Sequence, residues 1–174
     1  MKTVINIVKA SVLLLLLLSF FSGGCKNSSQ AEGIDRELYD KARETTGFIW
    51  YKKSDALLNT TSGSGHNFPF LRTRYNSIAS ANLNDAGRII EGSTFPAGSV
   101  IVKEFHDSSK KIARYAVLYK NPDSKDADSK GWVWGYINAD GTIAQSATEK
   151  GNGCNSCHNQ SGNIDYMLMN KYFP

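Results

Sequence analysis

Three residues near the C-terminus have the types and the spacing of a covalent cofactor site. Cys154 and Cys157 are separated by two residues, and His158 follows directly. This Cys-x-x-Cys-His order is the attachment signature of c-type haem, in which each thiol adds to a vinyl group at the porphyrin edge and the imidazole binds the iron. The sequence therefore predicts one covalently attached haem c, with His158 as the iron ligand.

Two other kinds of site use closely spaced cysteines. A structural zinc site needs four ligands, and the remaining histidines, His66 and His106, do not stand at zinc-finger spacing. A thioredoxin-like redox motif is expected near a βαβ pattern, which this sequence does not show. An exported domain without haem, closed by a Cys154–Cys157 disulfide, stays open as an alternative.

The N-terminal residues have the composition of an export signal. A basic start precedes an apolar run over 11–21, which is shorter than the about 20 residues that cross a bilayer. Ser22–Cys25 then resembles a bacterial lipobox, with an ordinary signal peptide as the alternative. We expect residues 1–24 to be a lipoprotein signal peptide and Cys25 to carry lipid. The protein would then be anchored on the periplasmic side of a membrane, the outer membrane in a cell with two.

The remainder predicts a tether followed by one domain. Residues 25–33 are rich in Ser, Asn and Gln and predict a flexible tether, and residues 34–174 predict a single haem domain. The chain has 20 Lys and Arg against 16 Asp and Glu, and its net charge of +4 falls to +2 when Lys2 and Lys9 leave with the signal. These mixed charges give no reason to expect nucleic acid as a partner.

The part of the domain before the motif predicts short strands. They are β-branched or aromatic and are bounded by Gly, Pro, Asn or Asp. Helical pattern is limited to about 35–45, 77–90 after a candidate cap at Asn76, and 163–172. We therefore expect an α+β fold, mainly an antiparallel sheet with a few short helices, in which the C-terminal segment holds the haem. The expected strands are Gly47–Lys52, Phe70–Tyr75, Ser99–Phe105, Ile112–Lys120 and Gly131–Ile137.

Alternation along the strands predicts which side chains share a face of this sheet. Trp132, Trp134 and Tyr136 share one face, which we interpret as core, with contact to the haem as the alternative. Lys103 shares a face with Ile101, so this lysine has a route to a buried ring edge.

Six stretches of the chain carry a family resemblance. In their order and spacing the chain resembles the cytochrome P460 family, which includes the β-sheet cytochromes c′ (cytochromes c′-β), over about Phe70–Pro174. Related proteins tend to be dimers, so the resemblance also implies a homodimer. The stretches are Arg72–Tyr75, Phe95–Glu104, Gly131–Trp132, Cys154–His158, Asp165–Met167 and Tyr172–Pro174.

Some members of the family are oxidoreductases, and this sequence has only part of the residues that their activity requires. Members that oxidise hydroxylamine or nitric oxide tie their haem to a lysine nitrogen, and the corresponding residue is Lys103, whose plain alternative is a surface lysine. Hydroxylamine-oxidising members also carry a distal carboxylate on the next strand, where this chain has Ala116. Acid–base catalysis needs such a group within reach of the substrate. Glu149 would replace it only in a fold that brings it to the open side of the iron.

Cytochromes c′-β share the architecture without the cross-link. They cap the open iron face with phenylalanines, which admit small uncharged gases and disfavour polar ligands. Arg72 and Arg74 could hydrogen-bond a ligand or a haem propionate, or lie exposed on their strand. The phenylalanines available as a cap, each equally interpretable as core, are Phe68, Phe70, Phe95 and Phe105.

Our leading hypothesis is an exported, five-coordinate c-type haem protein that binds nitric oxide or a related small nitrogen species. A P460-type oxidoreductase with a Lys103–haem cross-link is the second hypothesis. The sequence does not identify its redox partner. A six-coordinate electron-transfer cytochrome is the third, with His106 as the sixth ligand. Met167 and Met169 lie close to His158 in sequence and are better interpreted as helix packing.

Overall fold

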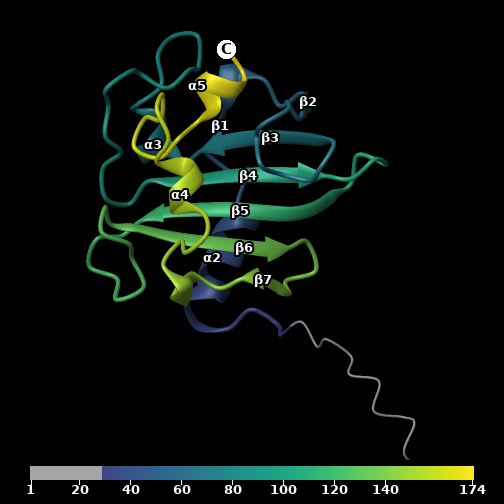
Figure 1. Ribbon diagram of the computed structural model, residues 1–174, viewed down its shortest axis with the longest axis vertical. Coiled ribbons are helices and arrows are strands. Elements are labelled where there is room, and N and C mark those ends of the chain that lie inside the picture. Colours follow the sequence, from purple (N-terminus) through teal and green to yellow (C-terminus); the bar gives the residue numbers. More distant parts are fainter. Residues whose placement is uncertain (1–28) are drawn as a thin grey trace, which may run out of the picture.

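The aromatic and β-branched segments pair into the antiparallel sheet that the sequence predicts. The computed structural model describes residues 29–174, in which seven strands form one sheet (Figure 1). The strand order is β1-β3-β4-β5-β6-β7, with β2 also paired to β3, so most neighbours are consecutive in the chain. The strands are β1 (Ile49–Trp50), β2 (Leu58–Asn59), β3 (Phe70–Tyr75), β4 (Val100–His106), β5 (Ile112–Lys120), β6 (Trp132–Asn138) and β7 (Ile143–Gln145).

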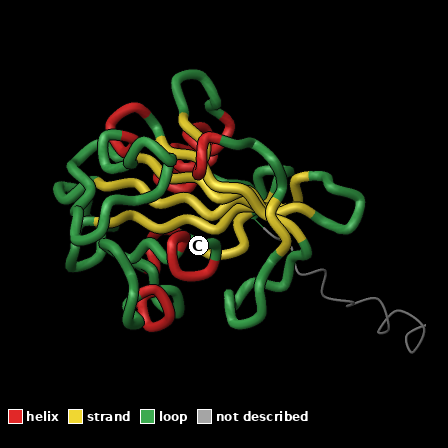
Figure 2. Tube along the Cα trace, turned by 90° about the horizontal axis from the view of Figure 1, so that it is seen from above, coloured by secondary structure: helices red, strands yellow, loops and turns green. Residues whose placement is uncertain are grey.

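Short helices cover both faces of the sheet. Helix α2 lies against β5 and β6 on one face, and the C-terminal segment with α4 and α5 covers the other (Figures 1 and 2). We call these the α2 face and the C-terminal face. No helix among residues 29–174 is long and apolar enough to cross a bilayer. The helices are α2 (Gly33–Arg43), α3 (Ser77–Ser80), α4 (Asn155–His158) and α5 (Met169–Tyr172), with 3-10 turns η1 (Tyr51–Lys53) and η2 (Ala147–Glu149).

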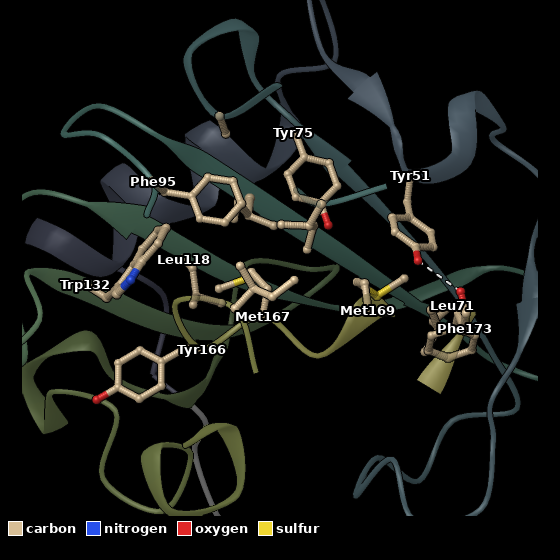
Figure 3. Packing of buried hydrophobic residues seen from close by; sticks show 14 of the residues in the cluster. Tyr51, Leu71, Tyr75, Phe95, Leu118, Trp132, Tyr166, Met167, Met169 and Phe173 are labelled. Atoms are coloured by element: carbon tan, nitrogen blue, oxygen red, sulfur yellow. Dashed lines mark hydrogen bonds between the residues drawn. The ribbon is translucent and has the colours of Figure 1, made fainter. Parts of the chain in front are cut away.

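Alternation along the strands separates two hydrophobic cores. On the α2 face, Val102 and Val133 pack with Leu38 and Ala42 of α2. On the C-terminal face lies the larger cluster of aromatic and methionine side chains drawn in Figure 3, where the Tyr51 hydroxyl donates to the carbonyl of Phe173 at 2.9 Å. Trp132 and Trp134 belong to this cluster and Tyr136 packs against it, so the predicted shared face is confirmed.

The α2 face also holds a buried ionic cluster. Glu104 is 2% exposed, accepts a hydrogen bond from Arg72 Nε at 2.5 Å, and pairs with the Arg74 guanidinium, which also donates to the carbonyl of Ala42 in α2. The His106 ring contacts the same carboxylate at 3.3 Å. Arg74 is buried in this cluster, and Arg72 pairs with the same carboxylate while 25% of its side chain stays exposed, so neither arginine lines the cavity. The hypothesis that His106 binds iron is wrong. Alternation along β3 and β4 turns all three side chains away from the C-terminal face.

The first described residues belong to the sheet. The Ile143 amide donates to the carbonyl of Ser29 and the Ala31 amide donates to that of Gly141, both at 2.9 Å, around a bridge between Gln30 and Thr142. The part of the predicted tether at 29–33 is thus paired or helical. The predicted signal peptide 1–24 and Cys25 lie outside the described residues.

The helix expected over 77–90 is much shorter than predicted. Asn76 caps it as expected, accepting from the Ala79 amide at 2.9 Å, but α3 ends at Ser80. The Asn84 side chain then accepts from the amides of residues 86 and 88, and Gly87 adopts φ +71°. Asparagine that bonds the following backbone favours a turn over a helix, so this local bonding outweighs the helical pattern.

Truncation of a side chain between α2 and the sheet provides a test of the fold. Leu38 is fully buried, so Leu38→Ala should lower the free energy of unfolding by about 2–5 kcal/mol, through lost burial and the cavity left behind. Denaturant unfolding followed by tryptophan fluorescence measures this. The exposed Glu37→Ala on the same helix should stay within about 0.5 kcal/mol of the parent. Equal effects of the two variants would contradict the packing described for α2.

Candidate haem site

A cavity of about 280 Å³ separates the C-terminal face of the sheet from the C-terminal segment. Its floor is formed by residues of β3, β4, β5 and β6. Residues 153–158 and 167–169 cover it, and residues 64–66 of the loop before β3 close one side. The segments with the haem motif and the strand with Lys103 therefore line one space, although some 50 residues separate them in sequence.

The floor contains a row of residues paired across β3, β4, β5 and β6. The strand register pairs Thr73 with Lys103, and Lys103 with Ala116, and all three line the cavity. The neighbouring row, two residues along each strand, holds the larger Leu118 and Trp134. The first row continues to Tyr136 on β6, which also lines the cavity. Because Thr73 and Ala116 are small, the space above the sheet lies on either side of Lys103.

The Cys-x-x-Cys-His motif forms the short helix α4 at the cavity wall. A helical turn brings residues three apart to the same side, and both Cys154 and Cys157 line the cavity with free thiols. Gly151 makes this approach possible, because a Cβ there would stand 2.7 Å from the Trp134 ring. Within residues 29–174, no group of three or more His, Cys, Asp or Glu side chains could hold a metal ion by itself.

The His158 ring is oriented by a backbone carbonyl. Its Nδ1 lies 2.8 Å from the oxygen of Tyr166, which can only accept, so Nδ1 donates and Nε2 carries the lone pair. Burial, followed by the positive charge of Lys103, lowers the pKa of His158 to about 4. The imidazole is therefore neutral at neutral pH. A neutral ring with one nitrogen donating to a carbonyl is the usual form of a histidine metal ligand.

The carbonyl that holds His158 belongs to a tight turn where the sequence predicts helix. Of the expected helix 163–172, only Met169–Tyr172 is helical. Asp165 and Tyr166 adopt φ of +46° and +73°, and the Asn163 side chain accepts from the Tyr166 amide at 3.0 Å. Positive φ is uncommon for residues other than glycine, so tertiary contacts must stabilise this turn.

Asp165 supplies those contacts. Its carboxylate accepts from Lys120 Nζ at 3.1 Å, from Trp132 Nε1 at 3.1 Å and from the backbone amide of Phe95 at 3.0 Å. The Lys120 and Asp165 side chains are only 10% and 6% exposed. Three donors, from two strands and a loop, thus fix this turn. The carbonyl of the next residue, Tyr166, orients His158.

Lys103 lies where strand alternation predicts it, on the same face as Ile101 and in the cavity lining. Burial of the amine lowers the pKa of Lys103 to about 8. Ala116 stands beside it in the register, and the described residues that line the cavity include no Asp or Glu. Glu149 is outside this lining and faces the amide of Gln145.

Two of the four candidate phenylalanines stand near the cavity. Phe68 and Phe105 stack with ring centroids 5.1 Å apart beside its loop side. Phe95 packs between Tyr75 and Trp132 in the core, and Phe70 alternates with Leu71 on the other face of β3. Met167 and Met169 line the cavity and point into the same core (Figure 3), but Met167 precedes α5 rather than belonging to a helix.

His66 is a site residue that sequence reasoning missed. It comes from the loop between β2 and β3, and its ring centroid lies 6.5 Å from that of His158 and 4.5 Å from that of Phe105. Its Nδ1 is 3.2 Å from the Tyr136 hydroxyl. Burial, then the charges of Lys103 and His158, lower the pKa of His66 to about 3, so this ring is also neutral. The loop sequence has no periodicity that could have placed it.

A mainly apolar cavity with a neutral, oriented histidine and two thiols in its wall suits a haem, and these features define a small β-sheet haem protein. The family model for cytochrome P460 matches residues 51–169, so the chain belongs to the cytochrome P460 family. The family implies a haem cofactor. Searches among curated proteins and among solved structures gave no significant match.

Loss of the Asp165 charge should weaken the turn beside His158. Asp165→Asn would leave Lys120 without its buried partner, and we expect the free energy of unfolding to fall by about 1–3 kcal/mol. Thermal or denaturant unfolding of the haem-free chain measures this. Asp123→Asn changes an exposed aspartate in a neighbouring loop and should have little effect. The anchoring role of Asp165 would be rejected if both variants unfolded alike.

Proposed function

We propose that the chain is a c-type haem protein that binds nitric oxide or a related small nitrogen species. Cys154 and Cys157 would hold the haem through thioether bonds and His158 would be its iron ligand. The observation that carries the proposal is the composition of the cavity. Its described lining residues are mainly apolar and include His158 but no carboxylate.

The cavity walls favour ligands that need few hydrogen bonds. When bound, the haem would supply an iron on which a diatomic ligand can be held. Around it, the short Ala116 in the lining, with the stacked Phe68 and Phe105 rings behind His66, gives little compensation to a ligand that loses its hydration. Besides His158, the polar side chains among the described lining residues are Ser64, His66, Thr73, Lys103, Tyr136 and Gln145, and none of them is a carboxylate. This supports binding of small, weakly polar species over acid–base turnover of hydroxylamine.

The P460-type oxidoreductase remains the second candidate because of one observation. Lys103 lines the cavity between the small Thr73 and Ala116, and its lowered pKa leaves more neutral amine near neutral pH than an exposed lysine has. A neutral amine beside a porphyrin edge is the requirement for a lysine cross-link. Without a carboxylate in the described lining, the proton-transfer part of that activity has no assigned residue.

Spectroscopy of protein produced with haem c attachment machinery tests the two candidates together. We expect haem to stay with the polypeptide after denaturation, an ordinary reduced c-haem spectrum, and binding of nitric oxide. A strongly red-shifted, broad reduced Soret band that becomes ordinary in Lys103→Arg would place the oxidoreductase first. A chain that takes up no haem would overturn both candidates.

Export and anchoring are proposed on the N-terminal sequence. Removal of residues 1–24 and lipid on Cys25 would place the domain on the periplasmic side of a membrane, the outer membrane in a cell with two. A homodimer and an unidentified redox partner complete the proposal.

Cell fractionation tests the anchor. The parent protein should sediment with membranes, and Cys25→Ser should appear in the soluble fraction because lipid would no longer hold it. Cys154→Ser is the matched control and should leave membrane association unchanged. Membrane association that survives Cys25→Ser would rule out lipid at this cysteine as the anchor.

A further inference from the structure

The rings of two histidines lie close together in one part of the cavity. His158 belongs to α4 in the C-terminal segment, and His66 belongs to the loop before β3, yet their ring centroids are only 6.5 Å apart. Both side chains line the same cavity. No hydrogen bond joins the two rings within the described residues, and each ring instead has a separate partner for its Nδ1.

The separation matches that of two imidazoles on one metal ion. A histidine nitrogen binds a transition metal at about 2 Å, and the ring centre lies about 1 Å beyond that nitrogen. The centroids of two imidazole rings bound on opposite sides of one ion are therefore about 6 Å apart, given this bond length. The planes of His66 and His158 meet at 64°, which two axial imidazoles can adopt because each ring turns freely about its own metal–nitrogen bond.

The surroundings of His66 hold it as metal-binding histidines are held. Its Nδ1 faces the Tyr136 hydroxyl at 3.2 Å, and its ring packs on Phe105 at 4.5 Å, so Nε2 is the nitrogen available to a ligand. His158 likewise uses Nδ1 for its hydrogen bond to the Tyr166 carbonyl, so its Nε2 is also available to a ligand. Hydrogen bonding of the second ring nitrogen fixes the orientation of a ligand histidine.

We propose that His66 is the second axial ligand of the haem iron, and that nitric oxide binds by displacing it. The proposal rests on the haem function proposed above and replaces the five-coordinate iron expected from the sequence. In the exchange the bond from the iron to His66 Nε2 breaks and a bond to the nitrogen of nitric oxide forms, with no net electron or proton transfer.

The loop that carries His66 is hydrogen-bonded at its base and rich in glycine at its tip. At its base, the Thr60 amide donates to the carbonyl of Pro69 at 2.9 Å, and the Thr60 hydroxyl donates to that of Phe68. Near its tip, Gly63 and Gly65 adopt φ of +85° and +72°, which glycine reaches without strain. If His66 is displaced, the glycines at the tip are the residues of this loop whose backbone is least restricted by a side chain.

Optical and electron paramagnetic resonance spectra of the haem-loaded protein test the ligand assignment. The ferric parent should be low-spin, and His66→Ala should be high-spin. Added imidazole should return His66→Ala to the low-spin state, which shows that the variant is folded and its cavity intact. The matched control is His106→Gln, which changes the histidine on the α2 face and should stay low-spin. A high-spin parent, or a low-spin His66→Ala without added imidazole, would overturn the assignment.

Nitric oxide binding separates this inference from the function on which it rests. Nitric oxide can bind only the molecules in which His66 is off the iron, so its apparent affinity falls with the fraction of such molecules. If His66 is bound in about nine-tenths of the molecules, His66→Ala should bind nitric oxide about tenfold more tightly than the parent. Equal affinity in the parent and the variant would contradict displacement, while the gas-binding function would stand. Failure of both proteins to bind nitric oxide would remove the gas-binding function and the displacement step, and the spin states would still report on His66 as a ligand.

Discussion

The carboxylate of Asp165 is the interaction on which the arrangement of the site depends. It joins two strands and a loop of the sheet to the C-terminal segment through Lys120, Trp132 and the amide of Phe95. The backbone that follows adopts a conformation that most side chains avoid, and this conformation directs the Tyr166 carbonyl to His158. A charged group that is almost inaccessible to water thus determines the orientation of an imidazole some way along the chain. Unlike a surface ion pair, it loses little strength to solvent screening.

Much of the fold follows from local sequence. The strands around Lys103 and Trp134 have an alternating pattern whose two faces the structure reproduces, because side-chain direction in a strand depends only on position parity. The errors occur where a polar side chain bonds the backbone. Asn84 and Asn163 each cap a turn inside a segment with helical pattern, and sequence periodicity does not report such bonds.

The site was less predictable than the fold. His158 and Lys103 were found because a fixed motif and a family resemblance name them, and the structure brings both to one cavity. Arg74 and His106 were placed wrongly because parity shows which residues of a strand share a face, but not which of two apolar faces carries the cavity. Glu104 resolves this, since a buried acid attracts the basic groups to the α2 side. His66 comes from an irregular loop, whose path only the folded chain defines.

The pairing of residues 29–31 with the segment around Thr142 has a consequence for the edge of the sheet. The outer edge of β7 would otherwise present unpaired amides and carbonyls, which recruit strands from other molecules. Ser29 and Ala31 occupy part of that edge with backbone bonds from the same chain. Because backbone bonds within the same chain occupy this part of the edge, less of it is open to pairing with strands of other molecules.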